Sequence, residues 1–307
     1  MEKNGISHIL VPLDFSESSL NALETAIALA KQQQAKITLL NVVDSSVIFG
    51  FNGPYYVSER TIDGMVDVSA GMLNPLLANL KEHKVECTSE IKVGLVPQAI
   101  IKAASDNDVD LIIMGTHGAS GAREFFIGST AQQVIKITSC PVLTVPLGKK
   151  WVDFKTILFP IRPIAEGAEK YDFLRKIIRH NNTSINVLIL ASADYDLEKT
   201  TLQKLVKELK TKVIEDEIKI SGSLKSGGNM AKAVLKMSKS VDADMIVITL
   251  KNEAAFNQSF IGPFEQYIVN HATVPVLGIR PKLTSSDSQG TKQQIHESFP
   301  SQIRELA

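Results

Sequence analysis

The sequence predicts an α/β protein made of two tandem, doubly wound sheets of five parallel strands each. The first observation is an internal repeat: ILVPLD at 9–14 and ILFPIR at 157–162 open alike, 148 residues apart. Further along the chain the offset falls to 134 and holds, so that DLIIM at 110–114 matches DMIVI at 244–248. The second observation is that each copy alternates short apolar strands with amphipathic helical stretches, which is typical of a mostly parallel sheet.

The repeat also predicts the division of the chain, whose 307 residues suffice for two ordinary domains. We expect a first domain over 1–147, a second over 154–281, and a polar, mobile tail over 282–307. The offset changes by 14 because the first copy is longer in its middle. That extra length includes the Gly- and aromatic-rich stretch 49–56, which is interpreted either as a lid over a site or as a surface loop.

In the first copy, apolar runs predict the strands. These runs lie at 8–13, 36–42, 88–93, 110–114 and 142–145. A helix is expected after Asp14, with Ser16 as its N-cap, because Leu20, Leu23 and Ile27 recur at helical spacing.

Three further helices are expected in the first copy. The second runs through Ile62 to Leu80, and Pro75 within it predicts a kink or a break. The third begins at Pro97, a residue that suits a first helical turn. The fourth begins at Ser129 or Thr130.

Composition narrows the classes of function. The chain is 44% hydrophobic and 21% charged, as globular proteins are, and its 33 basic and 33 acidic residues cancel. A protein that binds duplex nucleic acid normally carries a basic excess, so no nucleic-acid partner is expected. Cys87 and Cys140 form no disulfide framework, and no apolar run is long enough to span a membrane. We therefore expect a cytoplasmic protein.

The strongest chemical signal is a pair of glycine-rich segments that follow the apolar strand at 110–114. GTHG is followed, after nine residues, by GST at a predicted helix start. Glycines let backbone N–H groups approach an anion, and a helix N-terminus adds unpaired N–H groups and a favourable dipole. The residues of this phosphate cradle are Gly115, Thr116, His117, Gly118, Gly128, Ser129 and Thr130. Asp14 ends the first strand, where a carboxylate can accept hydrogen bonds from a ribose.

The spacing G-x2-G-x9-G-[ST], together with the opening ILVPLDFS, resembles the universal stress protein family over residues 5–147 and 154–281. The resemblance implies a Rossmann-like strand order of 3-2-1-4-5 and pairing of the two domains through their last strands, as an internal pseudo-dimer. It also implies that the glycine motif holds the phosphates of ATP, that Asp14 contacts the nucleoside and that the Val42 backbone contacts adenine. Pro12, beside Asp14, completes the expected site.

The second copy has lost this cradle. Only Gly262, the counterpart of Gly128, survives. Gly115, Gly118, Ser129 and Asp14 correspond to Thr249, Asn252, Pro263 and Arg162. We therefore expect the second domain to be structural or regulatory, with attraction of a different anion by Arg162 as the alternative.

The sequence thus favours an ATP-binding regulatory protein of the stress response, with or without Mg²⁺ beside the nucleotide. One alternative is a slow ATPase or adenylate-transferring enzyme, for which His117 is the nearby candidate base. Another is an interaction module that works without nucleotide. No GxSxG or HExxH motif and no metal-spaced Cys/His cluster occurs, so no catalytic or metal-binding residue is predicted. Unidentified protein partners and a homodimer of the tandem chain remain open.

Overall fold

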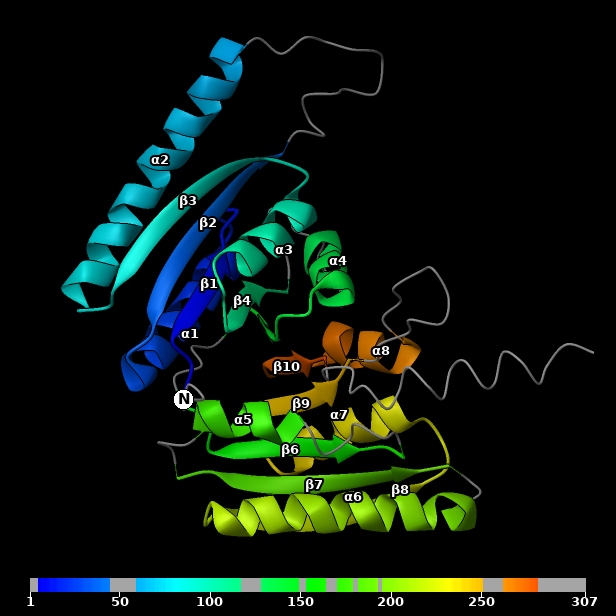
Figure 1. Cartoon of the computed structure of the whole chain (residues 1–307). Helices are drawn as coiled ribbons and strands as arrows, with labels where there is room; N and C mark the ends of the chain where they lie inside the picture. The colour runs from blue at the N-terminus through cyan, green and yellow to red at the C-terminus, as the bar shows by residue number, and fades with distance from the viewer. Residues whose placement is uncertain are drawn as a thin grey trace, which may run out of the picture.

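A computed structural model of the chain describes residues 5–44, 59–116, 128–148, 153–163, 170–178, 182–192, 195–250 and 262–280. These residues form an α/β fold around one sheet of ten strands (Figure 1). The fold class expected from the sequence is confirmed. The stretch 49–56, the tail 282–307, His117, Gly118 and Asn252 lie outside the described residues.

In the first half of the molecule, the described residues form five strands and four helices. The strands are β1 (His8–Pro12), β2 (Lys36–Asp44), β3 (Cys87–Gly94), β4 (Leu111–Gly115) and β5 (Val142–Val145). The helices are α1 (Glu17–Gln33), α2 (Glu59–Glu82), α3 (Val96–Asp106) and α4 (Ser129–Ile137). All five strands overlap those that the apolar runs predict.

The second half repeats this order of elements. Its strands are β6 (Thr156–Ile161), β7 (Ser184–Ala191), β8 (Lys219–Ser226), β9 (Met245–Thr249) and β10 (Val276–Ile279). Its helices are α5 (Lys170–Ile178), α6 (Tyr195–Glu215), α7 (Met230–Ser240) and α8 (Pro263–His271).

The strand order is β3-β2-β1-β4-β5-β10-β9-β6-β7-β8, which is 3-2-1-4-5 in the first half and its mirror in the second. Neighbouring strands are parallel within each half, whereas β5 and β10 are antiparallel, with Leu143 opposite Leu277. The two predicted sheets therefore join through their last strands into one continuous sheet. Buried apolar residues of both halves also belong to one core cluster.

Two local predictions have different outcomes. Ser16 is the N-cap of α1, as expected, and its Oγ accepts a hydrogen bond from the Ser19 N–H at 3.2 Å. Of the kink or break predicted at Pro75, the break does not occur, because α2 continues past it to Glu82. Pro75 and Gly71, four residues before it, are both exposed, so water can reach the carbonyl group that loses its N–H partner.

One landmark of the repeat has the same structural role in both halves. Asp110 precedes β4, and its Oδ2 accepts hydrogen bonds from the Ser7 and His8 N–H groups at 2.8 and 3.0 Å. Asp244 precedes β9 and accepts from the N–H groups of Lys155 and Thr156 at 3.0 and 2.9 Å. The carboxylate fixes the start of the fourth strand of each half against the first, so the repeated aspartate contributes to the fold.

The first and fourth strands of each half then part. In the first half, β1 and β4 are paired at Ile9 with Leu111 and at Leu10 with Ile112, near the start of both strands. Right-handed crossovers to either side of β1 place α1 and α2 on one face of the sheet and α3 and α4 on the other. Such a switch point leaves a crevice at the carboxyl ends of the strands. No helix of the described residues is long and apolar enough to cross a membrane.

Candidate functional site

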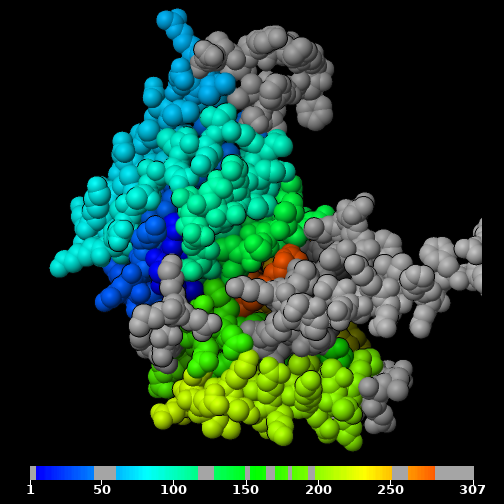
Figure 2. Space-filling view, viewed as in Figure 1, coloured from blue at the N-terminus to red at the C-terminus, as the bar shows by residue number. Residues whose placement is uncertain are grey.

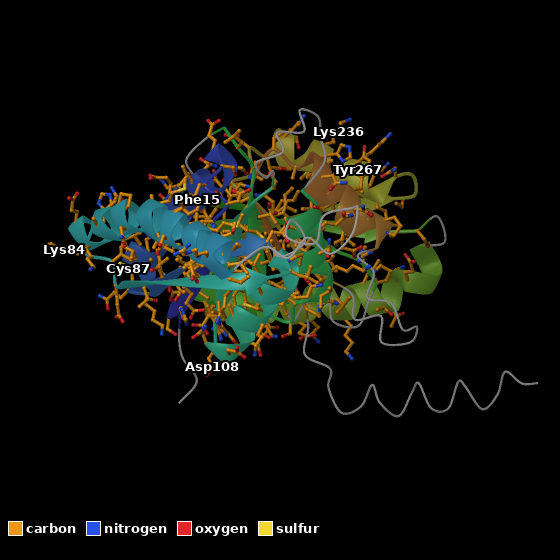
Figure 3. The ribbon with its side chains drawn as sticks, turned by 90° about the horizontal axis from the view of Figure 1, so that it is seen from above. Phe15, Lys84, Cys87, Asp108, Lys236 and Tyr267 are labelled. Atoms are coloured by element: carbon orange, nitrogen blue, oxygen red, sulfur yellow. The ribbon has the colours of Figure 1, made fainter. Side chains whose placement is uncertain are left out.

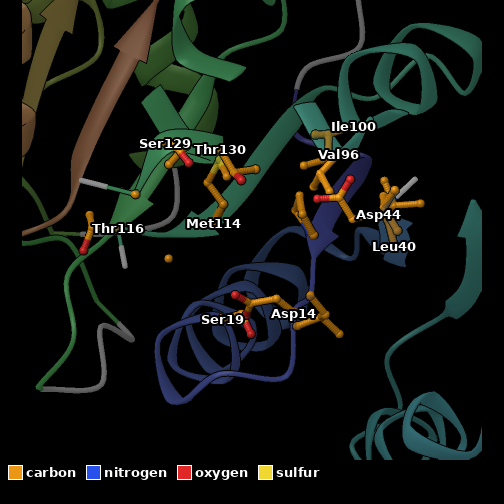
Figure 4. A pocket seen from close by; sticks show the side chains of 16 residues that line it. Asp14, Ser19, Leu40, Asp44, Val96, Ile100, Met114, Thr116, Ser129 and Thr130 are labelled. Atoms are coloured by element: carbon orange, nitrogen blue, oxygen red, sulfur yellow. The ribbon is translucent and has the colours of Figure 1, made fainter. Parts of the chain in front are cut away.

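A cavity of about 330 Å³ lies at this switch point, between the ends of β1, β2 and β4 and the first turns of α1, α3 and α4 (Figure 4). It gathers all eight described residues that the sequence singles out. These are Pro12, Asp14, Val42, Gly115, Thr116, Gly128, Ser129 and Thr130. His117 and Gly118 lie outside the described residues, so their positions relative to the cavity stay predictions.

The polar end of the cavity is the N-terminus of α4, where Thr116, Ser129 and Thr130 lie in Figure 4. Gly128 is the N-cap and provides no side-chain cap. The first intrahelical bond runs from the Gln132 N–H to the Gly128 carbonyl at 3.0 Å. The N–H groups of residues 129–131 therefore have no acceptor within the helix, and such a terminus attracts anions.

The two described cradle glycines also have roles within the fold. The Gly128 N–H donates to the Thr116 carbonyl at 2.6 Å, so it closes the loop that leads into α4. At Gly115, a Cβ atom would lie 2.7 Å from both the backbone carbon and the carbonyl oxygen of Ser18. Gly115 therefore allows the close approach of α1 to the end of β4, and that approach shapes the floor of the cavity.

Asp14 is exposed at the mouth of the cavity, on the turn from β1 into α1. Its Oδ1 accepts hydrogen bonds from the Ser16 N–H at 3.0 Å and the Ser16 Oγ at 2.6 Å. Between them lies Phe15, which is labelled in Figure 3. Its φ is 62°, which is uncommon for a bulky residue. This turn holds one carboxylate oxygen in place at the cavity entrance.

The other end of the cavity is largely apolar. Leu40 of β2 lies near Val96 and Ile100 of α3 in Figure 4, with Asp44 among them, and Val42 of β2 also lines the cavity. An apolar pocket with a few polar groups is typical of small-molecule sites. The cavity is thus polarised, with helix N–H groups and hydroxyls at one end and aliphatic side chains at the other.

Sequence reasoning missed half of the lining. The missed residues are Leu13, Ser19, Leu40, Asp44, Val96, Ile100, Met114 and Ala131. Most of them end a strand or lie in the first turns of the next helix, so the rule that ligands bind at carboxyl ends of parallel strands could have indicated them. The packing of the helices on the sheet decides which of these side chains face the cavity, and a short sequence motif does not specify that packing.

The corresponding place in the second half holds three charged side chains: Arg162, Lys170 and Glu265. We call them the Arg162 cluster. Arg162 forms an ion pair with Glu265, which is 1% exposed in the first turn of α8, and stacks on the Phe264 ring at 4.2 Å. The repeat offsets of 148 and 134 align the cluster with smaller or acidic residues of the first half. These are Asp14, Ala22 and Ala131.

Glu265 takes a position at α8 that a bound anion could otherwise fill. A Cβ atom on Gly262, the N-cap, would lie 2.5 Å from its Oε2, so the carboxylate is tucked against the start of the helix. A carboxylate is favoured there by the helix dipole. Arg162 is therefore committed to a partner within the chain.

Lys170 fills the gap where β6 and β9 part. Its Nζ donates to the carbonyls of Pro160 on β6 and Val247 on β9 and lies 4.3 Å from the centre of the Phe159 ring. Burial, with the Arg162 charge as a second cause, holds the pKa of Lys170 well below its usual value, and Glu265 opposes this shift. The repeat offset of 148 aligns Lys170 with Ala22, whose side chain is too short to span the corresponding split between β1 and β4.

The described residues give little support for a nucleophilic cysteine or for a metal site. Cys87 and Cys140 are not disulfide-bonded, and burial raises the pKa of the Cys140 thiol to about 12, which disfavours a reactive thiolate. Within the same residues, no group of three His, Cys, Asp or Glu side chains is placed to hold a metal ion.

Two relatives of known sequence each match slightly less than half of the chain. A universal stress protein of Bacillus subtilis, YxiE, is 33% identical over 143 residues, which is 45% of this chain and 97% of YxiE. Universal stress protein MJ0577 of Methanocaldococcus jannaschii is 30% identical over 150 residues, or 45% of this chain and 93% of that protein.

Solved structures match the whole architecture. A universal stress protein from Archaeoglobus fulgidus superposes with a TM-score of 0.72 over 91% of this chain and 99% of its own, at 18% sequence identity. A structure described as a putative universal stress protein from Pseudomonas aeruginosa gives a TM-score of 0.67 over 96% and 99%, at 16% identity. These similarities concern the fold.

The sequence pattern of the universal stress protein family matches this chain twice, over residues 5–146 and 176–280. The second match begins after β6, the strand that leads into Arg162, so the divergent start of the second half is also where the family pattern is lost. The chain therefore belongs to the universal stress protein family.

Proposed function

We propose that this stress-response protein binds an adenine nucleotide of the ATP type in the cavity of its first half and uses it as a regulatory ligand. The observation that carries the proposal is the uncapped N-terminus of α4, which opens on a cavity whose other end is apolar. Polyphosphate and base need opposite environments, and the cavity offers both within one crevice.

At the polar end, the phosphates would accept hydrogen bonds from the N–H groups and hydroxyls of Ser129 and Thr130. The helix dipole favours negative charge at this position. His117 and Gly118 belong to the same proposed cradle by sequence. Asp14, which accepts hydrogen bonds from Ser16 and lines the mouth of the cavity, would also accept a hydrogen bond from a ribose hydroxyl.

At the apolar end, a flat base would lie between Val42 and Leu40 on one side and Val96 and Ile100 on the other. The proposed contact of the Val42 backbone with adenine fits this end of the cavity. A volume of about 330 Å³ lies at the low end of the range of about 300–1,000 Å³ for small-molecule sites, so a single nucleotide is a fitting occupant.

Mg²⁺ would arrive with the phosphates. Within the described residues there is no cluster of protein ligands that could hold a metal by itself. Mg²⁺ commonly uses one or two carboxylates together with phosphate oxygens, and Asp14 and Asp44 are the carboxylates among the described residues that line the cavity. The second half, with Glu265 at the start of α8, is proposed to bind no nucleotide.

The test is a calorimetric and thermal-shift titration of the purified chain with ATP, with and without Mg²⁺, beside the variant Ala131→Glu. This variant places a carboxylate at the start of α4, as Glu265 does at α8, so it should exclude phosphate while giving the helix a favourable N-terminal charge. We expect wild-type stabilisation of about 2.7 kcal/mol at a hundredfold excess over Kd, and none in Ala131→Glu.

Ala78→Glu is the matched control, because it makes the same change on the exposed side of α2, away from the cavity. It should bind ATP as the wild type does. A wild-type protein that shows no shift at millimolar ATP would contradict the proposed function. Equal ATP binding by Ala131→Glu and the wild type would mean that the nucleotide does not use the start of α4.

A further inference from the structure

A side chain of the second half holds the far end of the helix that starts at the cavity. Arg280 directly follows β10, and its guanidinium reaches the C-terminus of α4. Its Nε donates to the Thr138 carbonyl at 3.1 Å, and its Nη2 donates to the carbonyls of Ile135 and Lys136 at 3.1 and 2.9 Å. Figures 1 and 2 place α8 and β10 against this part of the first half.

These carbonyls are among the four that a helix leaves without intrahelical partners at its C-terminus. The cation is also on the favourable side of the helix dipole. A helix of nine residues is too short to be stable by itself in water, so its ends and its packing decide its order. In α4 the two ends differ: the C-terminus is held by Arg280, whereas the N-terminus has no side-chain cap.

We propose that Arg280 is a positioning residue for the phosphate end of the cavity, through which the second half sets the nucleotide affinity of the first. This inference rests on the proposed function. Arg280 touches no nucleotide, because the nine residues of α4 span about 13 Å between its ends. Its effect is to fix the place and order of α4, so that the N–H groups at the cavity are oriented before the phosphates arrive.

Among the described residues, the second half provides this contact and the first half has no equivalent of it. The counterpart of Arg280 in the first half is Pro146, which has no side-chain donor. At the end of α8, the His271 Nδ1 instead lies 2.8 Å from the Tyr267 carbonyl of the same helix. The second half, whose crevice is filled by the Arg162 cluster, therefore supplies the contact to the C-terminus of α4. The first half, which has the cavity, receives it.

Coupling of this kind is reciprocal in free energy. If Arg280 improves phosphate binding by ordering α4, a bound nucleotide must strengthen the hold of α4 on Arg280. In the wild-type chain, saturating ATP should therefore slow amide hydrogen exchange at β10 more than at the distant edge strand β8.

The decisive variant is Arg280→Gln, which keeps a donor but removes the charge and the fork of N–H groups. We expect its ATP affinity to fall on the order of tenfold, within the usual range for coupled sites. Its affinity for adenosine, which has no phosphates, should stay unchanged. Without nucleotide, amide exchange over residues 128–140 should be faster than in the wild type. Arg280→Lys, which restores the charge, should recover part of the ATP affinity.

Arg175→Gln is the matched control, because it removes another arginine of the second half, one that pairs with Asp216. It should leave ATP affinity and exchange over residues 128–140 as they are. Calorimetry for ATP, NMR titration for adenosine and mass-spectrometric hydrogen exchange supply the measurements.

The outcomes separate the two proposals. A wild-type protein that binds no ATP overturns the proposed function and this inference with it. ATP binding by the wild type that Arg280→Gln leaves unaltered overturns only the role of Arg280. An equal loss of ATP and adenosine affinity would show a general structural role and would also overturn it. If Arg280→Gln does not fold, Arg280→Lys and the wild-type exchange at β10 decide the question.

Discussion

Gly115 shows how one residue can serve both the packing and the site. Its spacing within the glycine motif predicts an exposed backbone beside a phosphate. The structure adds that a Cβ atom there would lie 2.7 Å from backbone atoms of Ser18 in α1. Because backbone atoms cannot rotate away as a long side chain can, α1 itself would have to shift, and α1 contributes Ser19 to the cavity.

Gly115→Ala should therefore lower the free energy of unfolding by about 1–3 kcal/mol, the usual cost of overpacking. Gly71→Ala makes the same chemical change inside α2, where a Cβ atom meets nothing within 4 Å. That control should raise stability by up to about 1 kcal/mol through helix propensity alone. Urea unfolding of both variants gives the comparison, and a Gly115→Ala protein as stable as the wild type would rule out the tight approach of α1.

The residues of the site were predictable to different degrees. Asp14, Gly128 and Ser129 could be found because motif spacing reports local backbone geometry. The partners that determine their roles could not be found in this way. The Gly128 N–H bonds back to Thr116 across a loop, and Ser18 meets Gly115 from nearly a hundred positions away in the sequence. Such contacts depend on how elements dock, which the local sequence does not specify.

At the scale of elements, α4 and α8 are equivalent helices of the two halves that differ in the charge at their N-termini. Both follow a glycine N-cap without a side-chain cap. In α8, however, Glu265 supplies the negative charge from within, and Arg162 neutralises it. The sequence predicted that the second cradle was lost, from Pro263 and Arg162, but it did not indicate that Lys170 from α5 would span the split between β6 and β9.

Lys170, buried at this split, predicts how the free energy of unfolding depends on pH. Because the folded-state pKa of Lys170 lies well below that of the unfolded chain, the unfolded chain binds this proton more strongly. The free energy of unfolding should therefore rise as pH increases from the lowered pKa towards 10.5, by about 1.4 kcal/mol for each pKa unit of difference. Lys170→Met should lack this rise. Urea unfolding at several pH values from 7 to 10 tests it, and parallel profiles for the two proteins would contradict it.

At the scale of the whole molecule, the two halves share one continuous sheet. The antiparallel pairing of β5 with β10 makes a single sheet, and the same junction brings Arg280 to α4. The repeat, together with the family resemblance, was enough to predict this pairing and the strand order. The repeat aligns Arg280 with Pro146, but it does not show that the Arg280 side chain contacts the C-terminus of α4. That contact depends on how the two halves pack, so the difference between the halves could not be predicted.

One sheet implies that damage at the junction spreads to both halves. Leu277 is fully buried opposite Leu143, and Leu277→Ala should cost about 2–5 kcal/mol, as buried Leu to Ala changes do. Hydrogen exchange should then speed up in β4 and β5 as well as in β9 and β10. Leu188→Ala, a buried change on β7, is the control and should affect the second half alone. If the effect of Leu277→Ala stayed within the second half, the halves would be independent domains that merely touch, and the route from Arg280 to the cavity would lose its physical basis.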